Sequence, residues 1–109
     1  MESDDFVHAD QAHFQQVLRG ILDDTVQLHA DFGRFIDRDL AALSPVEHAI
    51  LLIGSYELRT RREIPYRVVI NEAVELAKSY GGTDGFRYIN GVLDKVAGLL
   101  RPDETARRG

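Results

Sequence analysis

Apolar residues recur at three- and four-residue intervals along most of this chain, and this spacing constrains the fold more than any other feature. Residues three and four apart share one face of an α-helix, whereas the residues of a strand alternate between two faces. A first stripe runs from near Asp10 to about Gly33. Its members are Phe14, Leu18, Ile21, Thr25, Leu28 and Phe32. Strand-like alternation is nearly absent, so the sequence predicts an all-α fold with helices packed around one core.

The clearest helix start lies at residues 44–47, Ser-Pro-Val-Glu. A serine N-cap can accept from the glutamate amide while the glutamate reaches back to the serine amide, and proline suits the first helical position. Residues 49–53 are apolar on nearly every side, which predicts a buried, central helix. Arg59, Arg61 and Arg62 lie near its C-terminal end, where cations complement the helix dipole.

Two more long helices are expected after it. Pro65 opens one that Gly81 and Gly82 end, and Thr83 or Asp84 caps the other, which stops at Arg101-Pro102. The predicted inner face of the first comprises Val69, Ala73, Leu76 and Tyr80. That of the second comprises Ile89, Val92, Leu93, Val96, Leu99 and Leu100. Gly91 falls within the second helix, where glycine costs about 1 kcal/mol against alanine, so we expect a neighbour to approach its backbone closely.

Composition narrows the class of protein. The chain has no cysteine, which excludes disulfides and thiolate metal sites. Its longest apolar run, residues 49–54, is too short to cross a bilayer, and its first ten residues are acidic, unlike a signal peptide. A cytoplasmic protein with no membrane association is expected. Residues 1–58 carry 11 acidic and 3 basic side chains, whereas residues 59–109 carry 7 and 10, which indicates either a basic face for an anionic partner or a solvated surface.

Residue patterns for catalysis are missing. The four histidines share no metal-ligand spacing and are interpreted as surface or cap residues: His8, His13, His29 and His48. Glu72 and Glu75 could imitate an acid/base pair, but Lys78 lies three residues beyond Glu75 and favours an ion pair. The loop at residues 81–85 follows a helix rather than a strand and lacks the lysine of a phosphate-binding loop. We therefore expect no enzymatic activity, no metal and no cofactor.

Arg87 and Tyr88 open the last predicted helix. A basic group beside an aromatic ring suits unstacked RNA bases. The alternative is a half-buried Tyr88 beside a solvated Arg87.

The order and spacing of seven segments, within roughly residues 10–102, resemble the NusB family of transcription antitermination factors. These segments are Leu43-Ser-Pro-Val-Glu47, Ile64-Pro-Tyr66, Ile70-Asn-Glu-Ala73, Glu75-Leu-Ala-Lys78, Tyr80-Gly-Gly-Thr-Asp84, Tyr88-Ile-Asn-Gly-Val-Leu-Asp-Lys95 and Leu100-Arg-Pro102. The resemblance implies a NusB-like helical bundle of two three-helix subdomains. It also implies that the chain pairs with ribosomal protein NusE, binds the boxA RNA of ribosomal RNA operons, and joins the RNA polymerase antitermination complex. By motif, Glu47 and Asp84 correspond to residues that face NusE, and Arg87 and Tyr88 to residues that face RNA.

The resemblance also divides the chain. Residues 1–9 are expected to be an acidic loop, residues 10–42 a partial N-terminal subdomain holding its third helix, residues 43–102 the C-terminal subdomain, and residues 103–109 a polar tail. Family members begin with two further helices, the first with an arginine-rich N-terminus, so boxA binding by these residues should be weakened. The apolar stripe of the first helix is then expected to fold back on the core or to form a homodimer.

Two other functions remain open. One is a NusB-like domain from a ribosomal RNA cytosine methyltransferase, and the other is a structural helical oligomer. The Arg101-Pro102 stop and the short charged tail favour a free-standing protein.

Overall fold

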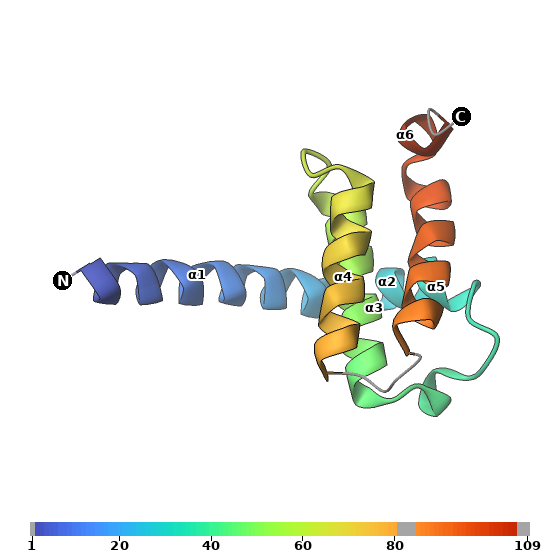
Figure 1. Cartoon of the computed structure of the whole chain (residues 1–109), viewed down its shortest axis with the longest axis horizontal. Helices are drawn as coiled ribbons and strands as arrows, with labels where there is room; N and C mark the ends of the chain where they lie inside the picture. The colour runs from blue at the N-terminus through green and yellow to red at the C-terminus, as the bar shows by residue number, and fades with distance from the viewer. Residues whose placement is uncertain (1, 81–84, 107–109) are drawn as a thin grey trace.

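The computed structural model describes residues 2–80 and 85–106, except for the side chains of residues 2–11 and of His13 (Figure 1). All regular secondary structure within those ranges is helical, which confirms the all-α prediction. The helices are α1 (Glu2–Asp23), α2 (Thr25–Gly33), the 3-10 turn η1 (Leu40–Ala42), α3 (Pro45–Thr60), α4 (Tyr66–Tyr80), α5 (Gly85–Leu100) and α6 (Pro102–Ala106). None of the helices so described is long and apolar enough to cross a membrane.

The body of the molecule is formed by α3, α4 and α5, which pack side by side, with α2 against α3 and α5 (Figure 1). The core lies between these helices. Its completely buried side chains are Phe32, Leu51, Leu58, Ile89, Leu93, Val96 and Ala97. Full burial of one large apolar side chain is worth about 1.5–3 kcal/mol, so this cluster is the main source of stability.

The sequence predicted the start of α3 correctly. Ser44 is the N-cap, Pro45 occupies the first turn, and the Ser44 hydroxyl and Glu47 carboxylate form both bonds of the capping box. Leu51 and Leu58 are completely buried, as expected of a central helix. The predicted faces of α4 and α5 are right only in part, because Tyr80 and Leu99 are exposed.

The close approach of α3 and α5 occurs at Gly54. A Cβ at that position would lie only 2.8 Å from Cδ1 of Leu93, so a larger residue would force the Leu93 side chain to shift. The expectation of a close approach at Gly91 is wrong. Nothing lies within 4 Å of a Cβ placed there, and Gly91 faces solvent.

The first helix begins earlier than predicted. It begins at Glu2, so the loop expected over residues 1–9 is helical from that residue, and α1 projects away from the body (Figure 1). Only the later part of its predicted stripe is buried: Leu28 and Phe32 are inaccessible, whereas Phe14 is 65% exposed and Leu18 43%. The stripe therefore contributes to the core only where the chain meets α3.

A break at Asp24 divides the single helix that the sequence predicted into α1 and α2. Asp24 has φ −104° and ψ 14°, outside the helical region. Next to it, the hydroxyl of Thr25 donates to the carbonyl oxygens of Ile21 at 2.7 Å and Leu22 at 3.2 Å. Threonine hydroxyls that bond to the preceding turn bend helices, which accounts for the break.

A buried arginine, Arg101, lies at the C-terminal end of α3. Arg101 has no exposed surface, and its guanidinium donates to four carbonyl oxygens, those of Glu57, Leu58, Arg61 and Ile64. These carbonyls lie at and just beyond the C-terminal end of α3, where the helix itself supplies no partners. Arg101 also pairs with Glu104, at 3.2 Å, on α6. The predicted polar tail is thus helical from Pro102 to Ala106, and residues 107–109 lie outside the described ranges.

Candidate functional site

The N-terminal ends of α3 and α5 lie beside each other at one end of the bundle, the lower end in Figure 1. Glu47, in the first turn of α3, accepts a hydrogen bond from the Ser44 amide at 3.1 Å through Oε1. A Cβ at Gly85, the first residue of α5, would lie 3.3 Å from its other oxygen. The carboxylate therefore caps its own helix and lies against the start of α5. Asp84, the second expected partner-facing acid, lies outside the described residues.

Tyr88 is half-buried and joins α5 to the loop after α2. Its hydroxyl donates to Oδ1 of Asp37 at 3.2 Å and accepts from the Asp37 amide at 3.3 Å. Arg38 donates to the same carboxylate at 3.0 Å and places its guanidinium carbon 4.3 Å from the centroid of the Tyr88 ring. One face of the ring is therefore covered by a cation, an arrangement that the sequence did not indicate.

These contacts perturb the ionisation of the loop. The hydrogen bond from Arg38 holds the pKa of Asp37 below its usual range, and the Tyr88 hydroxyl adds to the effect. Burial raises the pKa of Tyr88, so its hydroxyl stays protonated and can donate to Asp37. Arg38 in turn has its pKa raised, mainly by its bond to Asp37 and to a small extent by Glu47. The charge of Glu47 thus reaches the loop that covers Tyr88.

A second pairing of cations with an aromatic ring lies two residues earlier along α5. The Phe86 ring, half-buried at the start of α5, has Nζ of Lys78 at 5.1 Å from its centroid and the guanidinium carbon of Arg87 at 5.6 Å. Both cations are exposed. We call the five residues Arg38, Lys78, Phe86, Arg87 and Tyr88 the cation–aromatic surface. Alternating cations and rings can hold phosphates and stack unpaired bases.

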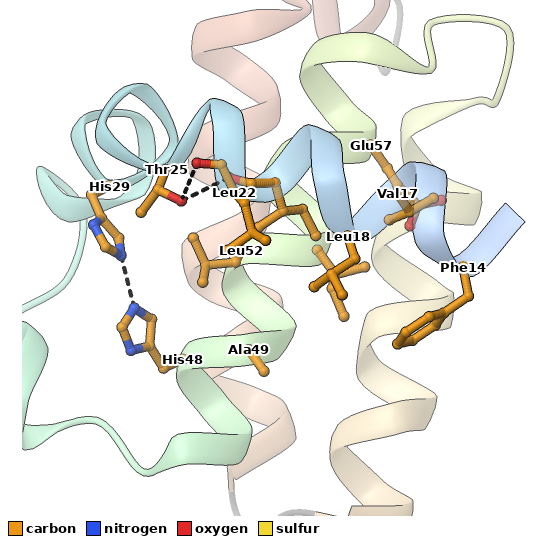
Figure 2. Close-up of a pocket in the computed structure, with 12 residues that line it drawn as sticks. Phe14, Val17, Leu18, Leu22, Thr25, His29, His48, Ala49, Leu52 and Glu57 are labelled. Carbon is orange, nitrogen blue, oxygen red and sulfur yellow. Dashed lines mark hydrogen bonds between the residues drawn. The ribbon is translucent and has the colours of Figure 1, made fainter. Parts of the chain in front are cut away.

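An apolar groove of about 560 Å³ lies between α1 and α2 on one side and α3 on the other (Figure 2). Its lining is mostly aliphatic, and His48 and Ala49, which follow Glu47 in the sequence, are part of it. Phe14, Leu18 and Leu22 of α1 form one wall, and Leu52 and Ile53 of α3 form the other.

Two histidines that the sequence analysis interpreted as surface or cap residues, His29 and His48, close one end of this groove. The Nε2 atoms of His29 and His48 lie 2.8 Å apart, a hydrogen bond that requires one proton between them (Figure 2). Burial lowers the pKa of His29, and the neighbouring His48 lowers it further. No spacing in the sequence could reveal this pair, because its members lie 19 residues apart on different helices. In the described part of the chain no three histidine, aspartate or glutamate side chains gather as a metal site would require.

Comparison with known families identifies the chain. The NusB family model matches residues 1–98. The transcription antitermination protein NusB of Bordetella pertussis is 56% identical over 103 residues, which are 94% of this chain and 67% of that protein. The NusB protein of Dechloromonas aromatica is 51% identical over 107 residues, 98% of this chain and 66% of its own length.

The fold agrees with these matches. The solved structure of T. maritima NusB superimposes with a TM-score of 0.77 at 30% sequence identity, covering 84% of this chain and 66% of that one. The chain thus spans about two thirds of the length of the relatives that it matches. Sequence and fold agree, and the chain belongs to the NusB family.

Proposed function

We propose that this chain is a non-catalytic adaptor in transcription antitermination, which pairs with ribosomal protein NusE and binds the boxA RNA of ribosomal RNA operons within the RNA polymerase antitermination complex. A factor that acts on transcribing bacterial RNA polymerase works in the cytoplasm. One observation carries the proposal: the acidic start of α3 adjoins the cation–aromatic surface at the start of α5. One end of the bundle therefore offers one region for a basic protein and another for RNA.

The RNA-binding half of the proposal depends on Arg87 and Tyr88. Arg87 is exposed and can reach a phosphate, and Lys78, which also lies against Phe86, adds a second positive charge. Neutralising phosphates supplies most of the non-specific affinity for nucleic acid, whereas rings and guanidinium planes hold the bases. Residues 1–58 carry 11 of the 18 acidic side chains and only 3 of the 13 basic ones, whereas Lys78 and Arg87 lie in the more basic part of the chain.

The protein-binding half depends on Glu47 and Asp84. Glu47 is half-buried, so an arginine or lysine of NusE that reached it would form a partly desolvated ion pair. Such pairs cost more to break than exposed ones. Because Glu47 also caps α3, this acid is held in place before any partner arrives.

Co-elution distinguishes this function from the two alternatives. The chain is mixed with purified NusE and passed over a size-exclusion column, with and without boxA RNA. A complex that contains both proteins, and that retains RNA, is the expected result. A domain taken from a ribosomal RNA methyltransferase, or a structural oligomer, would elute apart from NusE, and that outcome would refute the proposal.

We further propose that two copies associate through α1. Phe14, Leu18 and Leu22 are spaced four residues apart and are 65%, 43% and 66% exposed, which places three large apolar side chains on one open face. An antiparallel arrangement with Leu18 opposite the second copy's Leu18 brings Phe14 opposite the second copy's Leu22. The same helix thus supplies both sides of a symmetric contact that extends the groove wall.

A further inference from the structure

Arg38 lies over Tyr88 and is linked to it through Asp37. Its guanidinium lies 4.3 Å from the ring centroid, and its Nε donates to Asp37, which also accepts from the Tyr88 hydroxyl. Each of the three side chains therefore contacts the other two. A guanidinium is planar, and these contacts leave its plane little freedom to rotate.

The outer face of this guanidinium is accessible. The Arg38 side chain is 42% exposed although its guanidinium carbon lies 4.3 Å from the centroid of the Tyr88 ring. A base that approaches from this side meets Arg38 before it can meet Tyr88. Unpaired RNA bases stack on arginine planes as well as on aromatic rings.

We propose that Arg38 is a base-stacking residue, which holds one unpaired RNA base on the face turned away from Tyr88. The inference rests on the proposed RNA binding and extends that site from α5 to the loop after α2. Tyr88 then acts largely through Arg38, as the support beneath it, and Arg87 supplies the contact with phosphate.

The charge of Arg38 is not its main contribution, because Asp37 already pairs with it at 3.0 Å. A cation paired with a carboxylate releases few counterions from RNA, whereas an unpaired one that contacts a phosphate releases about one. Stacking and phosphate contact therefore predict different behaviour. Loss of stacking lowers affinity at every salt concentration, and loss of a phosphate contact flattens the salt dependence.

The decisive variant is Arg38→Lys, which keeps the charge and removes the plane. The binding of fluorescent boxA RNA to the complex of this chain with NusE is measured across a salt titration. We expect about a fivefold or greater loss of affinity with Arg38→Lys and with Arg38→Ala, and little change in salt slope with Arg38→Lys. Arg67→Ala is the matched control. The guanidinium carbon of Arg67 also lies near a tyrosine ring, 5.9 Å from the centroid of Tyr66. These two residues begin α4, whereas Lys78 of the cation–aromatic surface lies in its last turn.

A second measurement separates stacking from a structural role in the loop. Abasic substitutions are placed at each position of the boxA RNA in turn. At one position the loss from the missing base and the loss from Arg38→Lys should not add, because both remove the same contact. A variant that merely disturbed the loop would add its loss equally at every position.

The outcomes of these measurements distinguish the stacking role of Arg38 from the proposed function of the chain. If the wild-type complex binds boxA RNA and Arg38→Lys binds it equally well, Arg38 does not stack, while the proposed function stands. Additive losses at every abasic position would also overturn the stacking role. If the wild-type complex binds no RNA, the proposed function fails and the role of Arg38 fails with it.

Discussion

Arg59 on α3 holds the buried carboxylate of Asp31 on α2 with two hydrogen bonds of 2.8 Å each. Gln27, one turn before Asp31, adds a third at 3.1 Å. This pair fastens α2, and through it α1, to the body of the molecule. Arg59 is one of the three arginines near the end of α3, and its guanidinium is already paired with Asp31.

The Asp31–Arg59 pair should be important for stability. Removing one partner of a buried ion pair costs about 3–5 kcal/mol, and because the Arg59 side chain is 34% exposed we expect the lower end of that range for Arg59→Ala. Chemical denaturation at neutral pH measures the loss. Glu75→Ala is the control, since its pair with Lys78, which the sequence predicted, is exposed and 3.9 Å long, and should contribute less than about 1 kcal/mol. Equal stability of the two variants would contradict this account.

The same pair should make the fold sensitive to acid. Burial would raise the pKa of Asp31, but the hydrogen bonds from Arg59 and Gln27 outweigh it and hold the pKa below its usual value. The stabilisation is therefore present above the unfolded pKa of about 3.9 and is lost as the pH falls through the lower, folded value. Melting temperatures of Asp31→Asn should depend less on pH below about 4 than those of the wild type.

The histidine pair should act in a separate, higher pH window. The pKa of His29 is lowered by burial and by His48, so the neutral form is favoured in the folded chain. Stability is then highest above the unfolded pKa of about 6.5 and falls as the pH drops below that value. We expect the wild type to melt at a lower temperature at about pH 5.5 than at about pH 7.5, and His29→Gln to show a smaller difference. If the two proteins give the same pH profile, the lowered pKa of His29 contributes nothing to stability.

Glu47 and Asp84 should carry the binding of NusE. Glu47→Lys and Asp84→Lys are each expected to weaken it, by about 2–5 kcal/mol if the ion pairs are desolvated. Because Glu47 also caps α3, the control is Glu47→Gln, which keeps the capping box and removes the charge. Calorimetry of each variant with NusE measures the effect. Unchanged affinity in both lysine variants would remove these residues from the interface.

The exposed face of α1 should drive self-association. Sedimentation of the chain at increasing concentration should show a dimer, and Leu18→Glu should split it into a less stable monomer. The matched control for Leu18→Glu is Gln15→Glu, which adds the same charge at an exposed position one turn away. A stable monomer at all concentrations would contradict the dimer. So would a dimer that Gln15→Glu and Leu18→Glu weaken equally.

Local patterns predicted the helices of the body well. The capping box at Ser44 and the apolar stripe through Ile89 and Leu93 depend on residues within a turn or two of each other, and the structure confirms both. The break at Asp24 was missed because the apolar spacing continues across it, while the cause is the hydroxyl of Thr25. The burial of Arg101 could have been predicted from its spacing in the sequence. It lies four residues beyond Ala97 on the buried face of α5.

Contacts between distant residues could not be predicted in this way. Arg59 meets Asp31 across 28 residues, and Tyr88 meets Asp37 across 51, so no spacing within one helix predicts either. The prediction that Arg87 and Tyr88 form one site rested only on their being adjacent in the sequence. In the structure Arg87 lies against Phe86, and the cation over Tyr88 is Arg38.

The proposed role of the cation–aromatic surface is decided by the binding of boxA RNA to the complex of this chain with NusE, measured by fluorescence anisotropy over a range of salt concentrations. Arg87→Ala should reduce the slope of log affinity against log salt by about 1, as the loss of one phosphate contact requires. Tyr88→Ala should cost about 1–3 kcal/mol, and Tyr88→Phe, which keeps the ring, should cost less. Wild-type binding that neither Arg87→Ala nor Tyr88→Ala alters would place the RNA elsewhere, and the arginines at the end of α3 would be the next region to test. The absence of any boxA binding by the wild-type complex would contradict the account as a whole.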